Sequence, residues 1–255
     1  MKKILATIII VLMLVIPFIA FKGMLPAVGD PSSAPNTHTS DYYIEHTEDI
    51  CNSPNMVTSV IVDFRAFDTM FETTVMFLAG LCVLLILSEG RKNPVAPAIK
   101  PDRDKSKKPV FNTMNKEVML AIIEPVILIY AIDVLFHGEV SLGGGFQAGA
   151  LIGMVYLLDG MFASREKKIF TFSKFDAMAI AGTGPFIYAL CGILTLIGGG
   201  VFLEYAKFPL PIEEAELHSV GILMVEIGVT VGVMCTIITI LNGIMERVGF
   251  DDDDN

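Results

Sequence analysis

The 255-residue sequence is 53% hydrophobic and 18% charged, with a formal net charge of −10 and a mean hydropathy of +0.63. Soluble domains carry about 25% charged residues. This composition therefore argues against an ordinary soluble enzyme, and the acidic balance gives no reason to expect a nucleic-acid partner.

The apolar residues are gathered into six runs, each close to or above the roughly 17–25 residues that cross the hydrocarbon core of a bilayer. We therefore expect an all-α, polytopic integral membrane protein with about six transmembrane helices in the cell membrane. The runs are Ile4–Phe21, Phe67–Leu87, Val118–Phe136, Phe146–Phe162, Ala177–Leu203 and Leu217–Ile244.

Basic residues are distributed unequally between alternate connecting segments. If the amino terminus is cytoplasmic, the inside segments hold 15 of the 18 Lys and Arg residues, and the outside segments hold Lys22, Arg65 and Lys207. This asymmetry follows the positive-inside rule. It predicts that both termini face the cytoplasm.

The first run follows Lys2 and Lys3 and could begin a secretory signal peptide, but its length favours an uncleaved helix. The stretch from Lys22 to about Ser59 is rich in Pro, Ser, Thr and Asn, so we expect an external loop with little regular structure. Three residues in it, His38, His46 and Cys51, have spacings that fit no metal site. We interpret them as part of a solvated loop, and we expect no metal site or cofactor in the chain.

A proline- and lysine-rich segment separates the second and third runs. We expect an N-terminal two-helix part with its external loop at residues 1–90, a basic cytoplasmic linker at 91–116 and a four-helix domain at 117–255. No nucleotide-binding glycine loop or nucleophile–base set is recognisable, so the chain is not expected to be an enzyme by itself.

A glycine-rich turn joins the third and fourth runs. It follows His137-Gly138-Glu139. Glycine permits close backbone approach, and irregular backbone at membrane depth is tolerated only against protein or water. A flexible hairpin is the simpler interpretation of such a run alone, whereas the polar neighbours favour a functional turn. The turn consists of Gly143, Gly144, Gly145, Phe146 and Gln147.

Ionisable residues within or beside the runs are costly and commonly mark ion or proton paths. For Asp68, His137 and Asp159, which lie near the ends of runs, an interfacial position is an equally good explanation. Asp68 and Glu72 are four residues apart and share a helix face, and Arg65 could favour their ionisation; helix capping is the alternative. The candidates for an ion path are Asp63, Arg65, Asp68, Glu72, Glu124, Asp133, His137 and Glu226.

Two motifs resemble those of the Mrp/Mnh multisubunit sodium/proton antiporters. Asp63-Phe64-Arg65-Ala66-Phe67-Asp68-Thr69-Met70-Phe71-Glu72 is similar to a signature near the carboxyl end of the large A subunit. Ser141-Leu142-Gly143-Gly144-Gly145-Phe146-Gln147-Ala148-Gly149 is similar to a turn of the B subunit. Ala66, Phe71, Leu142 and Ala148 depart from the family pattern. Similar modules occur in membrane-bound hydrogenases and in sulfur- or formate-linked respiratory complexes.

The resemblance implies an accessory subunit in which Glu72 and Glu226 help to form or border a path for protons or sodium ions. It also implies A/D-, C-, E-, F- and G-like partner subunits in the lipid bilayer, and in some complexes a redox arm with hydrogenase-like subunits. A structural scaffold that conducts nothing remains the alternative. A stand-alone transporter is disfavoured, because no convincing inverted repeat is present.

Overall fold

The computed structural model describes residues 2–24, 38–88, 113–141, 143–162 and 173–251, and within these ranges the chain is helical and contains no strand. The chain divides into two compact units, Met1–Glu45 and His46–Asn255. The first contains helix α1, Lys2–Met24, which includes Pro17. Most of the expected linker at 91–116 lies outside the described residues.

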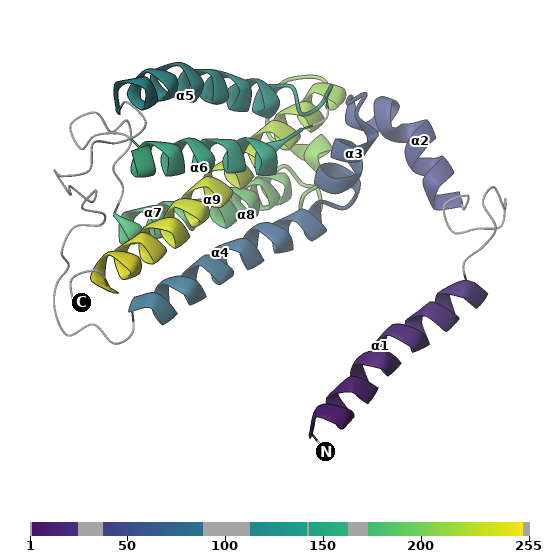
Figure 1. Ribbon diagram of the computed structural model, residues 1–255. Coiled ribbons are helices and arrows are strands. Elements are labelled where there is room, and N and C mark those ends of the chain that lie inside the picture. Colours follow the sequence, from purple (N-terminus) through teal and green to yellow (C-terminus); the bar gives the residue numbers. More distant parts are fainter. Residues whose placement is uncertain (1, 25–37, 89–112, 142, 163–172, 252–255) are drawn as a thin grey trace. The chain divides into compact units, whose positions relative to one another are not determined.

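The second unit is organised around its last and longest helix, α9 (Figure 1). Helices α4, α6, α7 and α8 all pack against α9, while α5 packs mainly against α6. The elements after α1 are α2 His38–Cys51, α3 Met56–Thr58, the π-helix η2 Ser59–Phe64, α4 Ala66–Ser88, α5 Thr113–Phe136, α6 Gly145–Phe162, α7 Lys174–Ala181, α8 Thr183–Ile197, the 3-10 helix η3 Tyr205–Lys207 and α9 Glu214–Asp251.

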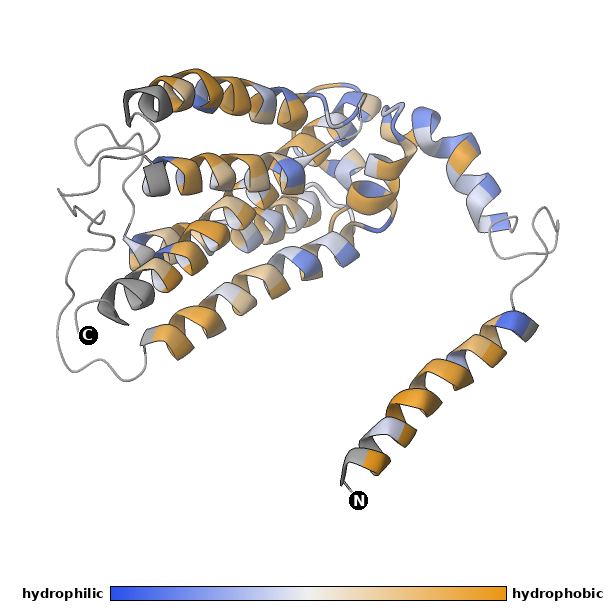
Figure 2. Cartoon of the chain, viewed as in Figure 1, coloured by the Kyte–Doolittle hydropathy of each residue, from blue (hydrophilic) through white to orange (hydrophobic). Residues whose placement is uncertain are grey.

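Four helical stretches among the described residues are long and apolar enough to cross a membrane, and hydrophobic residues make up much of α4, α5 and α9 (Figure 2). Helix α1 contributes a shorter apolar stretch, Thr7–Lys22. The predicted all-α membrane fold is thus confirmed, whereas the predicted number of six spanning helices is not. The four stretches are Ala66–Leu87, Val118–Phe136, Phe175–Ile197 and Glu214–Met245.

Glycines allow two helices to approach α9 closely. A methyl group at Gly149 of α6 would come within 2.7 Å of the Thr230 carbonyl oxygen, and one at Gly184 of α8 within 2.7 Å of the Gly228 carbonyl oxygen. Small residues serve this purpose between membrane helices, whose association depends on van der Waals packing rather than on the exclusion of water. These contacts place α6 and α8 directly on the α9 backbone.

The expectation of little regular structure between Lys22 and Ser59 is wrong for His38–Cys51, which forms α2. Thr47 and Cys51, one helical turn apart, are both buried, so the segment has one face that packs. Asp41 in the first turn is favourable at the positive end of a helix. Polar and apolar residues alternate over short distances in this segment, so the sequence pattern alone does not reveal the packed face of the helix.

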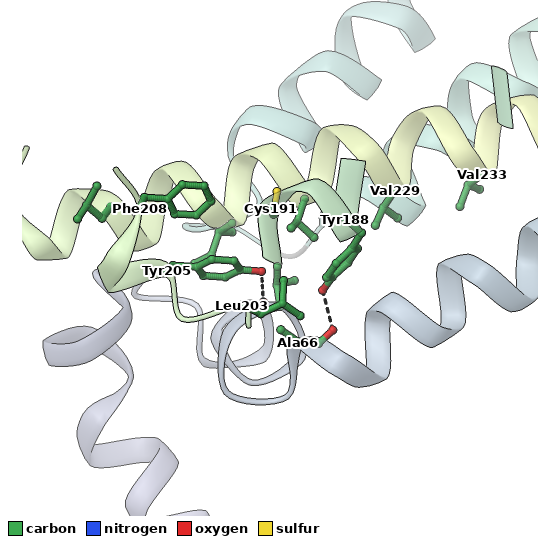
Figure 3. Close-up of a cluster of buried hydrophobic side chains, with 12 residues drawn as sticks. Ala66, Tyr188, Cys191, Leu203, Tyr205, Phe208, Val229 and Val233 are labelled. Carbon is green, nitrogen blue, oxygen red and sulfur yellow. Dashed lines mark hydrogen bonds between the residues drawn. The ribbon is translucent and has the colours of Figure 1, made fainter. Parts of the chain in front are cut away.

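Two buried tyrosines fasten the start of α4 to the rest of the unit (Figure 3). The Tyr205 hydroxyl donates to the Val62 carbonyl at 3.0 Å, and the Tyr188 hydroxyl donates to the Ala66 carbonyl at 2.8 Å. Val62 belongs to the π-helix η2, whose wider turn ends at Arg65. Side-chain donors thus satisfy carbonyl groups where the helix changes form.

Candidate functional site

The Glu226 carboxylate lies against the glycine-rich turn. Glu226 is only 4% exposed and belongs to the Glu214–Met245 apolar stretch of α9. A methyl group at Gly138 would come within 2.8 Å of both carboxylate oxygens, and one at Gly144 within 2.8 Å of Oε1. The carboxylate therefore occupies space that exists because these two positions lack side chains. Two features that are far apart in the sequence meet at this site.

The rest of the glycine run is packed rather than open. A methyl group at Gly145 would collide with the Glu226 carbonyl oxygen, and one at Gly143 would come within 2.7 Å of a Val134 methyl. Thr230 Oγ1 donates to the carbonyl oxygens of Gly145 and Glu226 at 3.1 and 2.8 Å. Of the two neighbouring candidates, Phe146 packs on the apolar core and Gln147 is exposed. The turn is thus a close contact between the start of α6 and α9.

The His137–Ser141 turn is held in place by residues that precede α4. The Asn55 side-chain amide donates to the carbonyls of Gly138 and Ser141 at 3.0 and 2.7 Å. Thr58 Oγ1 donates to the Gly138 carbonyl at 2.7 Å, and Ser53 Oγ donates to the Glu139 carbonyl at 2.9 Å.

We call Ser53, Asn55 and Thr58 the turn clamp. These residues were not among the candidates predicted from the sequence. The one local signal is Asn55 as the cap of α3, where its side chain accepts from the Val57 N–H, and that signal does not reveal the distant partners.

A second carboxylate lies beside Glu226. Glu139 is close enough for the two charges to repel one another. Burial raises the pKa of Glu139 above its ordinary value, and a hydrogen bond to Ser219 partly opposes this rise. Two carboxylates in one poorly solvated place favour the uptake of a proton or a cation. This pair is the chemical centre of the candidate site.

The acidic residues of α4 lie on a different surface. Arg65 forms an ion pair with Asp68, and both side chains are more than half exposed. Glu72, one turn further along, is also exposed on the surface of this chain, within the Ala66–Leu87 apolar stretch. Asp68 and Glu72 therefore share one face of α4, as the sequence predicted, but this face points away from the core that holds Glu226. A helix-end role accounts for Asp68 and leaves Glu72 unexplained.

Helix α5 carries two kinds of ionisable groups. His137 Nδ1 lies 3.0 Å from Asp133 Oδ1, and both side chains are exposed. Glu124, by contrast, is 4% exposed, and its Oε1 has no hydrogen-bond partner among the described residues. It interacts electrostatically with Asp159 of α6, which is 1% exposed. Both carboxylates therefore lie inside the helix bundle, and Asp159 is near the end of α6.

Asp63 does not join the acids of α4. Its Oδ2 lies 2.5 Å from Nδ1 of His218 at the start of α9. Cys51 lies beside this pair and is fully buried, so the interpretation as part of a solvated loop is wrong for Cys51. Burial and the Asp63 carboxylate raise the pKa of the Cys51 thiol to about 12. Spacing within the loop could not reveal this group, because His218 comes from a distant part of the chain.

Comparison with protein families divides the chain into two matching regions. Residues 116–239 match a domain related to the MnhB subunit of Na+/H+ antiporters, and residues 27–106 match the MbhE subunit of MBH. The A1 subunits of Na+/H+ antiporters from Staphylococcus haemolyticus and Staphylococcus aureus strain JH9 are 40% identical over 57 residues and 42% identical over 53 residues. These matches cover 22% and 21% of this chain, but only 7% of each relative.

Two solved structures resemble nearly the whole chain. The Mrp complex from Dietzia sp. DQ12-45-1b contains a chain with a TM-score of 0.71 and 21% identity, over 96% of this chain and 26% of that one; this likeness shows the fold alone. The membrane-bound sulfane sulfur reductase, an archaeal respiratory membrane complex, contains a chain with a TM-score of 0.64 and 25% identity, over 97% of both chains.

Proposed function

The chain combines an MnhB-related domain at residues 116–239 with an MbhE-type region at residues 27–106, and from this we propose that it is an accessory membrane subunit of a multisubunit cation/proton antiporter module. The module works either by itself or within a membrane-bound respiratory complex. The chain is a transport subunit rather than an enzyme, and both of its termini face the cytoplasm.

The observation that carries the proposal is the position of Glu226. A carboxylate in a membrane-spanning segment is costly and normally serves an ion or proton path. Here it lies at the glycine-rich turn, beside Glu139 and near irregular backbone. Transporters place coupling-ion sites where membrane helices are interrupted, and this carboxylate lies at the interruption between α5 and α6. Glu226 therefore exchanges a proton, or balances a sodium ion, on a path that this subunit borders.

The exposure of Glu72 supports a role within a larger assembly. An exposed carboxylate on an apolar helix is unfavourable against lipid. It is stabilised when a partner subunit supplies a polar or wet surface. The proposed partners are the A/D-, C-, E-, F- and G-like antiporter subunits, with a hydrogenase-like redox arm in respiratory complexes. Glu72 then lies on the path at the boundary between subunits.

The proposal is tested with Glu226→Gln and Glu72→Gln in the native complex. Each amide keeps the volume of the side chain but cannot release a proton or balance a cation. We expect both complexes to assemble and sodium-driven proton movement in membrane vesicles to fall at least tenfold. Glu216→Gln, at an exposed position in the first turn of α9, is the control and should leave transport unchanged.

The same measurement separates conduction from scaffolding. Normal assembly with full transport in both variants would contradict the proposed path and favour a structural subunit. If only Glu226→Gln fails to assemble, its carboxylate has a role in packing. The transport rate of Glu72→Gln then decides the question: a fall indicates that this subunit borders the path, and full transport indicates that it does not.

A further inference from the structure

Three side chains with different metal-binding atoms converge at one end of the second unit. They are Cys51 at the end of α2, Asp63 in η2 and His218 in the first turns of α9. The sulfur, a carboxylate oxygen and a ring nitrogen all lie within 4.8 Å of one another. Cys51 is fully buried, and the Asp63 and His218 side chains are 11% and 10% exposed. This group is separate from the Glu226 site and from the acids of α4.

The chemistry of the three groups selects a class of ion. Thiolate and imidazole ligands favour zinc and similar transition metals, whereas magnesium and calcium favour oxygen ligands. Three protein ligands leave one position of a tetrahedron for water. We propose that Cys51, Asp63 and His218 form a binding site for a divalent transition metal of the zinc type.

The geometry requires only a small rearrangement. Nitrogen and oxygen ligands on one tetrahedral zinc lie about 3.3 Å apart, given bonds of about 2.0–2.2 Å. Asp63 Oδ2 and His218 Nδ1 are hydrogen-bonded at 2.5 Å, so the ion must separate them by about 0.8 Å. Rotation of the two side chains can supply this movement. A sulfur–nitrogen separation of about 3.6 Å on the same ion also fits the observed spread.

Metal binding would fasten three elements together. Cys51 ends α2, Asp63 comes just before the turn into α4, and His218 lies two turns before Glu226, about 12 Å along the helix axis. The Tyr205 ring lies edge-on to the His218 ring, with centroids 6.3 Å apart, and limits the directions in which the imidazole can turn. The metal would therefore stabilise the start of both helices that carry the candidate transport carboxylates.

The alternative is a hydrogen-bonded group in which Asp63 accepts from both His218 and Cys51 and no metal binds. Metal analysis distinguishes the two. The assembled complex is stripped with a chelator, incubated with zinc or magnesium, dialysed and analysed for bound metal. We expect the wild type to retain one zinc per chain more than Cys51→Ser and His218→Gln, with no such difference for magnesium. Cys82→Ser and His38→Gln, both at exposed positions, should retain the wild-type amount.

X-ray absorption at the zinc edge gives a second readout. The wild type should show more zinc–sulfur scattering at about 2.3 Å than Cys51→Ser, and zinc should raise the unfolding temperature of the wild type but not of this variant. Equal zinc content and equal sulfur scattering in the two would overturn the proposal. If His218→Gln fails to assemble, the comparison with Cys51→Ser still decides. Because metal binding is measured without transport, the result is independent of the proposed function.

Discussion

At the scale of single residues, the space around Glu226 depends on the absence of side chains. Gly138 and Gly144 each leave room for its carboxylate oxygens, and no other residue type would do so without a shift. Overpacking a well-filled interior costs about 1–3 kcal/mol. The position of the carboxylate is therefore sensitive to a single methyl group.

We predict that Gly138→Ala displaces the Glu226 carboxylate, because the added methyl would lie 2.8 Å from both oxygens. The complex should lose about 1–3 kcal/mol of stability and a large part of its sodium-driven proton transport. Thermal unfolding and vesicle transport measure the two effects. Gly160→Ala is the matched control: its methyl would contact only Met245 Cε, at 3.8 Å, and alanine favours the helix by up to about 1 kcal/mol. Equal behaviour of the two variants would contradict the packing argument.

Glu139 provides a test by pH. Its pKa is raised above the ordinary value of 4.5 in the folded chain, so folding favours the protonated form, and stability falls as the pH rises from the unfolded pKa through the folded one. We predict that Glu139→Gln is more stable than the wild type at pH 8 and that the difference disappears near pH 4.

The unfolding temperatures of the two complexes across this range give the measurement. Ser219→Ala should act in the opposite direction to Glu139→Gln at pH 8, because it removes the hydrogen bond that opposes the rise in pKa. A stability difference between Glu139→Gln and the wild type that is independent of pH would show that the effect is steric rather than electrostatic.

At the scale of elements, length and hydropathy predicted the long helices well, because an apolar run of about 20 residues has few alternatives. They did not predict α2, whose buried face consists of the small residues Thr47 and Cys51. Glu226 could be selected as a candidate from its depth in an apolar run. Its contact with Gly138 and Gly144 could not, because that contact depends on how α6 and α9 pack.

The turn clamp joins the segment before α4 to the turn between α5 and α6. Asn55→Ala removes side-chain hydrogen bonds to the carbonyls of Gly138 and Ser141. Each of these two losses is worth about 0.5–1.5 kcal/mol, and the hydrogen bond from the Val57 N–H to the Asn55 side chain is lost as well. We therefore predict a destabilisation of at least about 1–3 kcal/mol and reduced transport. The control is Asn52→Gly. Glycine tolerates the φ of 51° that Asn52 adopts. The substitution removes a 3.4 Å hydrogen bond from the Asn52 amide to Ser219 and not one to the His137–Ser141 turn.

Thermal unfolding of both complexes tests the clamp. A loss of transport in Asn55→Ala without a change in stability would indicate that Asn55 acts directly on the path rather than through the position of the turn. A loss of stability in both variants would assign the effect to the Asn52–Asn55 segment as a whole.

At the scale of the whole molecule, the distribution of polar groups separates two environments. Glu226 and Glu124 are inside the helix bundle, whereas Glu72 and Asp68 face away from it. A chain that met only lipid would leave the outer pair poorly solvated. Under the proposed function, the outer face of α4 is therefore a surface that a partner subunit would cover.

The proposed orientation of the chain rests on its basic residues and gives the last prediction. If the chain crosses the membrane six times, 15 of its 18 Lys and Arg residues lie in alternate segments, and the positive-inside rule predicts that the 91–116 linker is cytoplasmic and that the segment before α9 is outside. Single cysteines at Lys105 and Glu214 should therefore react from opposite sides of the membrane, with Asn36 on the same side as Glu214.

Of the native cysteines, Cys51, Cys191 and Cys235 are fully buried, so only the exposed Cys82 needs replacement by serine. An impermeant thiol reagent added to intact cells should label Asn36→Cys and Glu214→Cys, and Lys105→Cys only after the membrane is opened; labelling of Lys105→Cys in intact cells would reverse the proposed orientation.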